Sequence, residues 1–229
     1  MLYQNKVIGT VAYMGGVPAV LEEFCWSWGQ LVQFNSEYLC QAGEVVQYDR
    51  ARVSYHAFAR NQLVTRMRGE WLLLLDTDHQ FEPDLAVRLV HRLYKYDLDV
   101  VTGLYQFKGP PFSPVLYTPS EDGESFLPIG AWDPVAPLFQ VAAAGAGCLL
   151  VRKRVFERMR LELKEEPFDI LPPLSEDLSF FKRLQRLGVR AFCDSRVEAY
   201  HLRTVPLSLI DYDQAQVQVS EYHQVEGYR

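Results

Sequence analysis

The stretch WLLLLDTDHQFEPD, residues 71–84, decides the fold expected of this chain. Its first five residues are apolar without alternation, which is typical of a strand buried on both faces of a parallel sheet. The run ends at Asp76, Thr77 and Asp78. Because residues i and i+2 of an extended chain point the same way, the two carboxylates are expected to converge just beyond the strand's carboxyl end, where open α/β sheets bind ligands.

Two carboxylates at that place suit a hard divalent cation such as Mg2+ or Mn2+, whose other positions are filled by water and phosphate oxygens. The alternative is a strand followed by a polar turn, and a bare Asp-x-Asp pattern is more often such a turn than a metal site. The next residues, Glu82 to Asp84, predict a helix start with Pro83 near the first helical position. The rest of the chain therefore has to decide between a metal site and a turn.

The composition predicts one ordinary globular domain, with 229 residues of which 48% are hydrophobic and 23% are charged. The net charge of −6 gives no overall attraction to nucleic acid or to an anionic membrane, although five arginines fall between residues 50 and 68. Four widely spaced cysteines form no CxxC pattern and are expected to be reduced thiols. With no leader and no apolar run long enough to span a bilayer, we expect a soluble, unprocessed cytoplasmic protein.

The first eighty residues predict a β-α-β-α-β unit, the pattern of a parallel sheet with right-handed crossovers. Gly15 and Gly16 permit a tight loop after the first strand. The expected elements before the central strand are a strand over 6–13, a helix over 17–34, a strand over 44–48 and a helix over 53–68.

The second half predicts helices and strands around a proline-rich irregular insert at 108–137, whose aromatic residues favour an ordered wall beside the substrate over disorder. The segment at 139–151 is dense in small residues, which let a ligand or another backbone approach closely. Ser175 is a predicted N-cap, and Gly188 a predicted helix stop. The other expected elements are helices over 84–96, 153–160 and 175–187, and strands over 99–107, 189–193 and 197–201.

The order of these motifs resembles the GT-A glycosyltransferases, particularly compact family-2-like members that use nucleotide-diphosphate sugars. The resemblance spans about residues 5–203. It is carried by DTD at 76–78, GAG at 145–147, SED at 175–177, ARN at 59–61 and FKRLQRLGVRAFCDSRVEAYHL at 181–202. It implies an α/β, Rossmann-like fold in a single domain, with a mixed, mainly parallel central sheet flanked by helices. Its nucleotide-binding half would be 1–107, its acceptor and catalytic half 108–203, and 204–229 a C-terminal tail.

The resemblance implies a metal site made by Asp76, Asp78 and His201, with Asp78 more directly on the metal and Asp76 nearer the ribose or sugar. A histidine in this place alone would more often be a core or surface residue. The resemblance also implies that Asp177 is the general base of an inverting reaction, with Glu176 as its orienting neighbour or substitute. The alternative role of these acids is helix capping.

Residues at the ends of the first strands match the places that hold the nucleotide in this family. Asp49 would accept from a uracil N3–H, and Arg60 would face the nucleotide, although a surface arginine is as common. The first loop, YMGGVPA, departs from the family's usual polar turn, and no QxxRW-type motif follows, which argues against a processive polysaccharide synthase. The implied donor-binding residues are Thr10, Ala12, Tyr13, Asp49, Arg60, Asp76, Thr77, Asp78 and Gly147.

The implied function is a metal-dependent hexosyltransferase that uses Mn2+ or Mg2+ and a UDP-sugar, with a GDP-sugar as the second choice. Inversion is favoured over retention. The acceptor stays open between a glycan, a protein and a modified nucleic-acid base, and so does the oligomeric state; compact proteins of this kind include phage-encoded ones, which act in the host cytoplasm. Two alternatives remain: a non-catalytic nucleotide- or glycan-binding protein, and a sugar nucleotidyltransferase, which normally has a basic, glycine-rich loop after its first strand.

Overall fold

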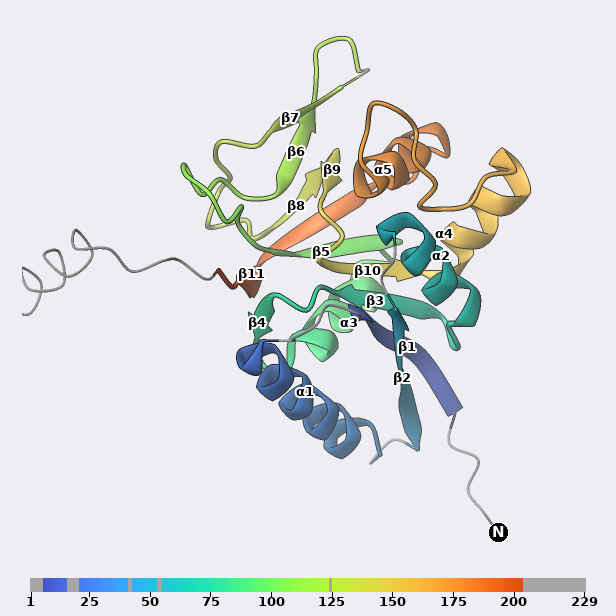
Figure 1. Cartoon of the computed structure of the whole chain (residues 1–229), viewed down its shortest axis with the longest axis vertical. Coiled ribbons are helices and arrows are strands. Elements are labelled where there is room, and N and C mark those ends of the chain that lie inside the picture. Colours follow the sequence, from blue (N-terminus) through green and yellow to red (C-terminus); the bar gives the residue numbers. More distant parts are fainter. Residues whose placement is uncertain (1–5, 16–20, 41–42, 53–54, 124, 204–229) are drawn as a thin grey trace, which may run out of the picture.

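The run Trp71–Leu75 forms strand β3 near the centre of an eight-stranded sheet, and all five of its residues are buried (Figure 1). The computed structural model describes residues 6–15, 21–40, 43–52, 55–123 and 125–203. Alternate side chains of β3 enter two separate cores, because Leu72 and Leu74 pack on one face and the other three residues on the opposite face. The prediction of a strand buried on both faces is confirmed.

The first part of the chain has the predicted β-α-β-α-β order, and β1 pairs in parallel with both β2 and β3. The helix predicted over 17–34 begins at Glu22 and ends at Cys40, and its predicted start at residues 17–18 lies outside the described residues. The elements are β1 (Lys6–Gly15), α1 (Glu22–Cys40), β2 (Glu44–Arg52), α2 (His56–Arg66) and β3.

The main sheet has the order β2-β1-β3-β10-β5-β11-β4, with β8 paired to β11. Strand β10 runs antiparallel between β3 and β5, whereas β5 and β11 are parallel to each other. The prediction of a mixed, mainly parallel sheet flanked by helices is therefore confirmed. The elements are β4 (His79–Phe81), α3 (Leu85–Lys95), β5 (Val100–Leu104), β8 (Leu138–Val141), β10 (Cys148–Arg152) and β11 (Ala191–His201).

Strand β11 corrects the prediction of two short strands at 189–193 and 197–201. It is one strand whose register with β5 shifts between Asp194 and Glu198. The polar residues that suggested a break form a bulge, which bends a strand without ending it. Asp194 is fully buried there and pairs with Arg92 at 2.6 Å, which satisfies its charge.

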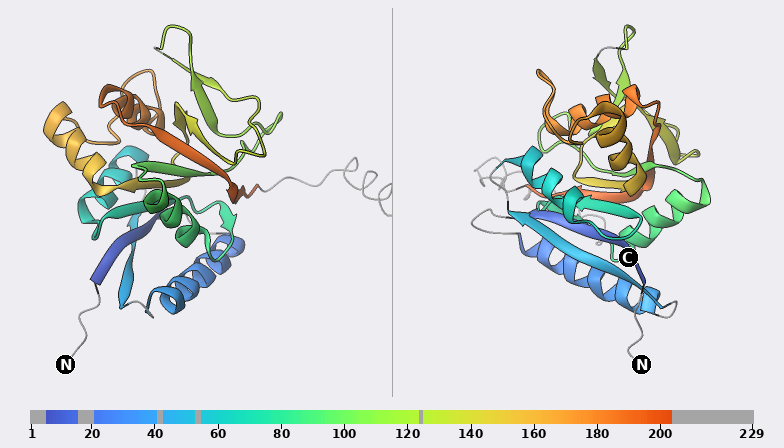
Figure 2. Two further views of the ribbon diagram at one scale, coloured as in Figure 1. Left: turned by 180° about the vertical axis from the view of Figure 1, so that it is seen from behind. Right: turned by 90° about the vertical axis from the view of Figure 1, so that its right-hand side faces the viewer.

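Helices cover both faces of the main sheet, and Figure 2 shows α1 on the side opposite α4 and α5. The core beneath α1 and α3 includes Leu85, Leu89 and Leu93, whose four-residue spacing places them on one face of α3. The second core lies beneath α2, α4 (Lys153–Arg158), its π-helical continuation (Met159–Leu163) and α5 (Glu176–Arg186). None of the helices in the described ranges is long and apolar enough to cross a membrane.

The insert at 108–137 is more regular than predicted, because it contributes two strands of a small separate sheet. Strand β6 (Leu116–Pro119) lies between β7 (Phe126–Pro128) and β9 (Ala143–Ala144). Aromatic residues of this region are ordered: Trp132 stacks on Phe139 with 6.2 Å between ring centroids, and both pack against the core. The tail at 204–229 lies outside the described residues.

Candidate active site

Strand pairing brings the last residues of β11 next to the DTD turn at residues 76–78. The turn leaves the carboxyl end of β3, and β4 then pairs antiparallel with the last residues of β11. In that register His79 lies opposite His201, and the Leu202 N–H donates to the Asp78 carbonyl at 2.7 Å. Residues more than 120 positions apart in sequence therefore meet at one edge of the sheet.

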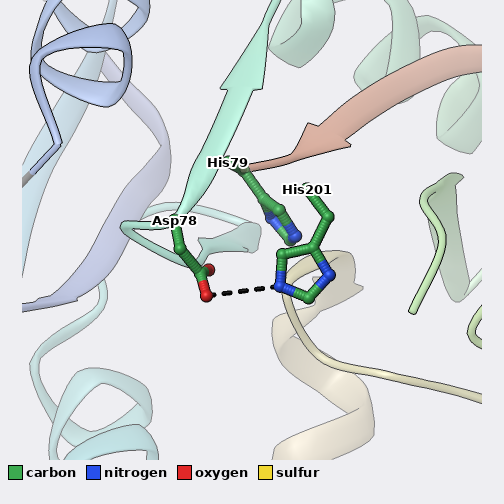
Figure 3. A group of neighbouring side chains, drawn as sticks. All are labelled: Asp78, His79 and His201. Atoms are coloured by element: carbon green, nitrogen blue, oxygen red, sulfur yellow. Dashed lines mark hydrogen bonds and ion pairs between the residues drawn. The ribbon is translucent and has the colours of Figure 1, made fainter. Parts of the chain in front are cut away.

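Asp78 stands between two positively charged or protonatable groups. Its Oδ2 lies 3.2 Å from Nε2 of His201 and 2.5 Å from Nζ of Lys108 (Figure 3). Burial alone would raise the pKa of Asp78, but these hydrogen bonds hold it well below its ordinary value. One ligand atom each from Asp78, His79 and His201 lies within 4.8 Å of the others, so these three side chains form a group able to hold a cation.

Nδ1 of His79 and Nδ1 of His201 each lie within hydrogen-bonding distance of a backbone carbonyl oxygen. Nδ1 of His201 is 2.8 Å from the Gln106 oxygen, and Nδ1 of His79 is 3.0 Å from the Gly147 oxygen. Burial lowers the pKa of His79. Burial opposes protonation of His201 too, but its hydrogen bond with Asp78 raises the pKa above the usual value.

Asp76 belongs to a different cluster from Asp78. Its Oδ1 accepts from Nη2 of Arg60 at 3.2 Å, and the other terminal nitrogen of Arg60 contacts the carboxylate of Glu176. Arg60 is 3% exposed; burial alone would lower its pKa, but Asp76, Glu176 and Asp177 raise it. The expected metal set is thus divided, with Asp78 beside His201 and Asp76 beside Arg60.

The small-residue segment leaves room for the side chains of this site. A Cβ atom at Gly147 would lie 2.5 Å from the His79 ring and 2.9 Å from Oδ2 of Asp76, and one at Gly145 would lie 1.9 Å from the Tyr105 hydroxyl. The Gly147 N–H donates to that hydroxyl at 3.1 Å. Burial, followed by the charge of Asp76, raises the pKa of Tyr105 well above its ordinary value.

Asp177 lies in the first turn of α5, after Ser175 at the N-cap position. Its Oδ1 accepts from the Leu178 N–H at 2.8 Å and from the Ser175 hydroxyl, so the serine bonds the aspartate instead of capping the helix as predicted. The half-buried Asp177 acts electrostatically on its surroundings: burial first and then its charge raise the pKa of Tyr117. It also contributes to the raised pKa of Tyr105, which places its charge near the Asp76 cluster.

The residues expected to hold the nucleotide differ in how much surface they offer. Thr10 and Ala12 are fully buried, and the Thr10 hydroxyl is engaged with the Arg68 backbone at 2.9 and 2.8 Å. Tyr13 is half-buried against aromatic rings of α1, and Asp49 pairs with the side chain of Arg66 at 2.9 Å. Thr77 is half-buried beside the DTD carboxylates.

His79 and Lys108 were not assigned a role from the sequence, and Tyr105 was expected only among the aromatic residues of the wall beside the substrate. His79 directly follows DTD, so the motif DTDH carried a signal for it. Tyr105 and Lys108 lie where the strand after α3 meets the insert, and no pattern there marks a function. They follow the end of β5, where Lys108 contacts Asp78 and Tyr105 contacts Gly147.

Comparisons with known proteins place this geometry in a family. The model of glycosyl transferase family 2 matches residues 32–159, more than half of the chain. Among solved structures, the crystal structure of S. aureus TarS 1-349 is similar, with a TM-score of 0.52 and 12% identity. The similarity covers 86% of this chain and 60% of that chain, and at this identity it concerns the fold. Curated protein sequences give no match.

Proposed function

Because the chain belongs to glycosyl transferase family 2, we propose that it transfers a sugar from a nucleotide-diphosphate donor to an acceptor hydroxyl with the help of a divalent cation. Family membership and the observed sheet bear out the resemblance to GT-A glycosyltransferases. The donor, the cation, the acceptor and the stereochemistry are parts of the proposal.

The observation that carries the proposal is the meeting of Asp78 and His201 beyond the carboxyl end of β3. The carboxylate and Nε2 are 3.2 Å apart, and the Gln106 carbonyl fixes the imidazole from its other side. A carboxylate and an imidazole oriented in this way fit a divalent cation. The chemistry that such a cation supplies is neutralisation of negative charge on the departing diphosphate.

Lys108 and Arg60 add positive charge to the donor side of the site. Lys108 is 41% exposed, and we expect its ammonium to exchange Asp78 for a donor phosphate. Arg60 is buried and binds Asp76 and Glu176 at once. It therefore holds the donor-facing aspartate and the start of α5 in a fixed relation, and Asp76 is left to orient the ribose or sugar.

Asp177 is the proposed general base. An acceptor hydroxyl that attacks the anomeric carbon must lose a proton, and a carboxylate within hydrogen-bond reach removes it. The Leu178 N–H and the Ser175 hydroxyl orient the Asp177 carboxylate, and Glu176 is fixed by Arg60. We therefore propose inversion, with Glu176 as the positioning neighbour.

For the donor we propose a UDP-hexose first and a GDP-hexose second, with Tyr13, Asp49 and Thr77 offering the accessible contacts. The small sheet of β6, β7 and β9 supplies the wall on the acceptor side. The acceptor classes are a glycan, a protein or a modified nucleic-acid base.

The test is release of nucleoside diphosphate from a panel of nucleotide sugars, each with candidate acceptors of the three classes and with Mn2+ or EDTA. Asp177→Asn is expected to bind the donor as the parent does and to lose transfer by at least a hundredfold, in line with the loss of a general base. Asp99→Asn, at the opposite end of β5 and paired with Arg154, is the matched control. Unchanged turnover in Asp177→Asn would refute the base assignment, and release of pyrophosphate would indicate nucleotidyl transfer instead.

A further inference from the structure

The structure holds a third potential ligand, His79, which the sequence pattern did not assign. We infer that Nε2 of His79 binds the same cation as Asp78 and His201, so that the site is a two-histidine, one-carboxylate centre selective for Mn2+ and other first-row transition metals over Mg2+ and Ca2+. The inference deepens the proposed function and rests on it for the presence of a cation at the DTD turn.

The orientation of the His79 ring is the first argument. A carbonyl oxygen only accepts hydrogen bonds, so Nδ1 of His79 carries the proton that it donates to Gly147. The neutral ring then has a lone pair on Nε2. That atom is fully buried and has no hydrogen-bond partner among the described residues, which is rare for a buried polar atom. A buried, unpartnered acceptor in the group formed with Asp78 and His201 indicates a missing positively charged ligand.

The same arrangement recurs on His201, which is the second argument. Its Nδ1 also lies on a carbonyl, that of Gln106, and its Nε2 faces Asp78. A histidine that ligates a metal nearly always donates its other ring N–H to a carbonyl or carboxylate, which fixes the ring and raises its basicity. Here two neighbouring imidazoles, with centroids 4.7 Å apart, each have Nδ1 bonded to a backbone carbonyl.

The distances fit with a closure of the cluster. Around a metal that forms bonds of about 2.1 Å, neighbouring ligand atoms are about 3.0–3.4 Å apart and ligand atoms on opposite sides are about 4.2 Å apart. Asp78 and His201 are already 3.2 Å apart, and since all three ligand atoms lie within 4.8 Å of one another, His79 has to approach by no more than about 1.8 Å. Figure 3 shows the three side chains close together, with the Asp78 carboxylate facing a ring nitrogen of His201 and the His79 ring beside the His201 ring.

The ligand chemistry sets the preference for the cation. Mg2+ and Ca2+ favour all-oxygen environments, whereas imidazole suits Fe2+, Ni2+, Cu2+ and Zn2+, and Mn2+ is the first and weakest member of the same affinity series. Asp76, the oxygen ligand that would favour Mg2+, is bound to Arg60 instead. A site with two nitrogens and one carboxylate therefore binds transition metals more tightly than Mg2+.

The experiment measures metal binding by the whole chain, with no nucleotide or sugar present. Mn2+ is titrated by electron paramagnetic resonance, and its bound form is examined by pulsed methods that count coupled imidazole nitrogens. We expect two such nitrogens, and no displacement of Mn2+ by a hundredfold excess of Mg2+. In His79→Asn, the amide N–H replaces the bond to the Gly147 carbonyl but Nε2 is deleted; we expect one coupled nitrogen and at least tenfold weaker Mn2+ binding, about 1.4 kcal/mol.

Two control variants separate the explanations. His91→Asn removes an exposed histidine of α3 and should leave the affinity unchanged. Asp76→Asn should reduce Mn2+ affinity less than His79→Asn does, whereas the ligand set expected from the sequence predicts the larger loss for Asp76→Asn. Thermal unfolding in EDTA reports whether each variant folds. If His79→Asn fails to fold, the number of coupled nitrogens in the parent chain tests the inference instead.

One coupled nitrogen in the parent chain, equal Mn2+ affinity in folded His79→Asn, or ready displacement by Mg2+ would overturn the inference. Because no donor is present, these results stand even if sugar transfer is never found. Sugar transfer that runs equally with Mg2+ and in His79→Asn would keep the proposed function and refute the role of His79.

Discussion

Replacing Gly147 by alanine is the most informative single change in this site. The added Cβ would lie 2.5 Å from Cε1 of His79, 2.9 Å from Oδ2 of Asp76 and 3.2 Å from the Tyr105 hydroxyl, where ordinary contact begins at 3.4 Å. The His79 ring would therefore have to withdraw by about 0.9 Å. The ring is bonded to the carbonyl of Gly147 itself, so withdrawal weakens that bond as well.

The size of the effect follows from these two contributions. Overpacking a well-packed interior costs about 1–3 kcal/mol. A weakened hydrogen bond adds about 1 kcal/mol, so we expect a loss of about 2–4 kcal/mol of unfolding free energy. For a chain of this length each kcal/mol lowers Tm by about 2–4 °C. Since the ligand His79 shifts, Mn2+ affinity should fall at least tenfold with the loss of ligand geometry.

The assay is urea unfolding monitored by circular dichroism, together with Mn2+ titration. Gly29→Ala in α1 is the control, because a Cβ there meets nothing within 4 Å. Alanine in a helix interior is favoured over glycine, so this variant should gain about 0.5–1 kcal/mol and keep its Mn2+ affinity. Parent-like stability and parent-like Mn2+ affinity in Gly147→Ala would refute the packing argument.

Two further outcomes are expected. Arg60→Met leaves the partly buried carboxylates of Asp76 and Glu176 without their cation. We expect urea unfolding to show a loss of about 3 kcal/mol of unfolding free energy, at the low end for a broken buried pair because both acids retain some exposure. A loss below about 1 kcal/mol would contradict the pairing. The ion pair of Asp78 and His201 predicts a pH window, because the folded pKa of the acid is lowered and that of the histidine is raised. The stabilisation from ionised Asp78 is lost as pH falls below about 4, and the stabilisation from protonated His201 is lost as pH rises above about 6.5. In EDTA, the Tm difference between the parent and Asp78→Asn should therefore be largest between these two pH values. A difference that does not vary with pH would contradict it.

Local sequence patterns were enough for the layers of the fold. The unbroken apolar run of β3 predicted burial on two faces, and alternating strands and helices predicted the first half. The direction of β10 could not be inferred in the same way, because its four apolar residues, Cys148 to Val151, look alike in a parallel and an antiparallel strand. The bulge in β11 looked like a break, because its polar residues find partners only in the folded sheet.

The site required long-range information. The family resemblance suggested Asp78 and His201, and the structure places them 3.2 Å apart. Strand β4 is three residues long, too short for any periodicity, so nothing local showed that His79 would face His201. Arg60 and Glu176, which pair in the structure, are 116 positions apart, and local sequence patterns cannot predict a contact over that separation.

The measurement that tests the central claim most directly is calorimetric binding of UDP, GDP, CDP and dTDP to the parent chain and to Asp78→Ala, each with Mn2+ and with EDTA. We expect one nucleotide to bind the parent in Mn2+, with at least tenfold weaker binding in EDTA or in Asp78→Ala, a difference of about 1.4 kcal/mol. Binding that is equally strong in EDTA and in the variant, or no binding of any of the four, would contradict a metal-dependent donor site at the DTD turn.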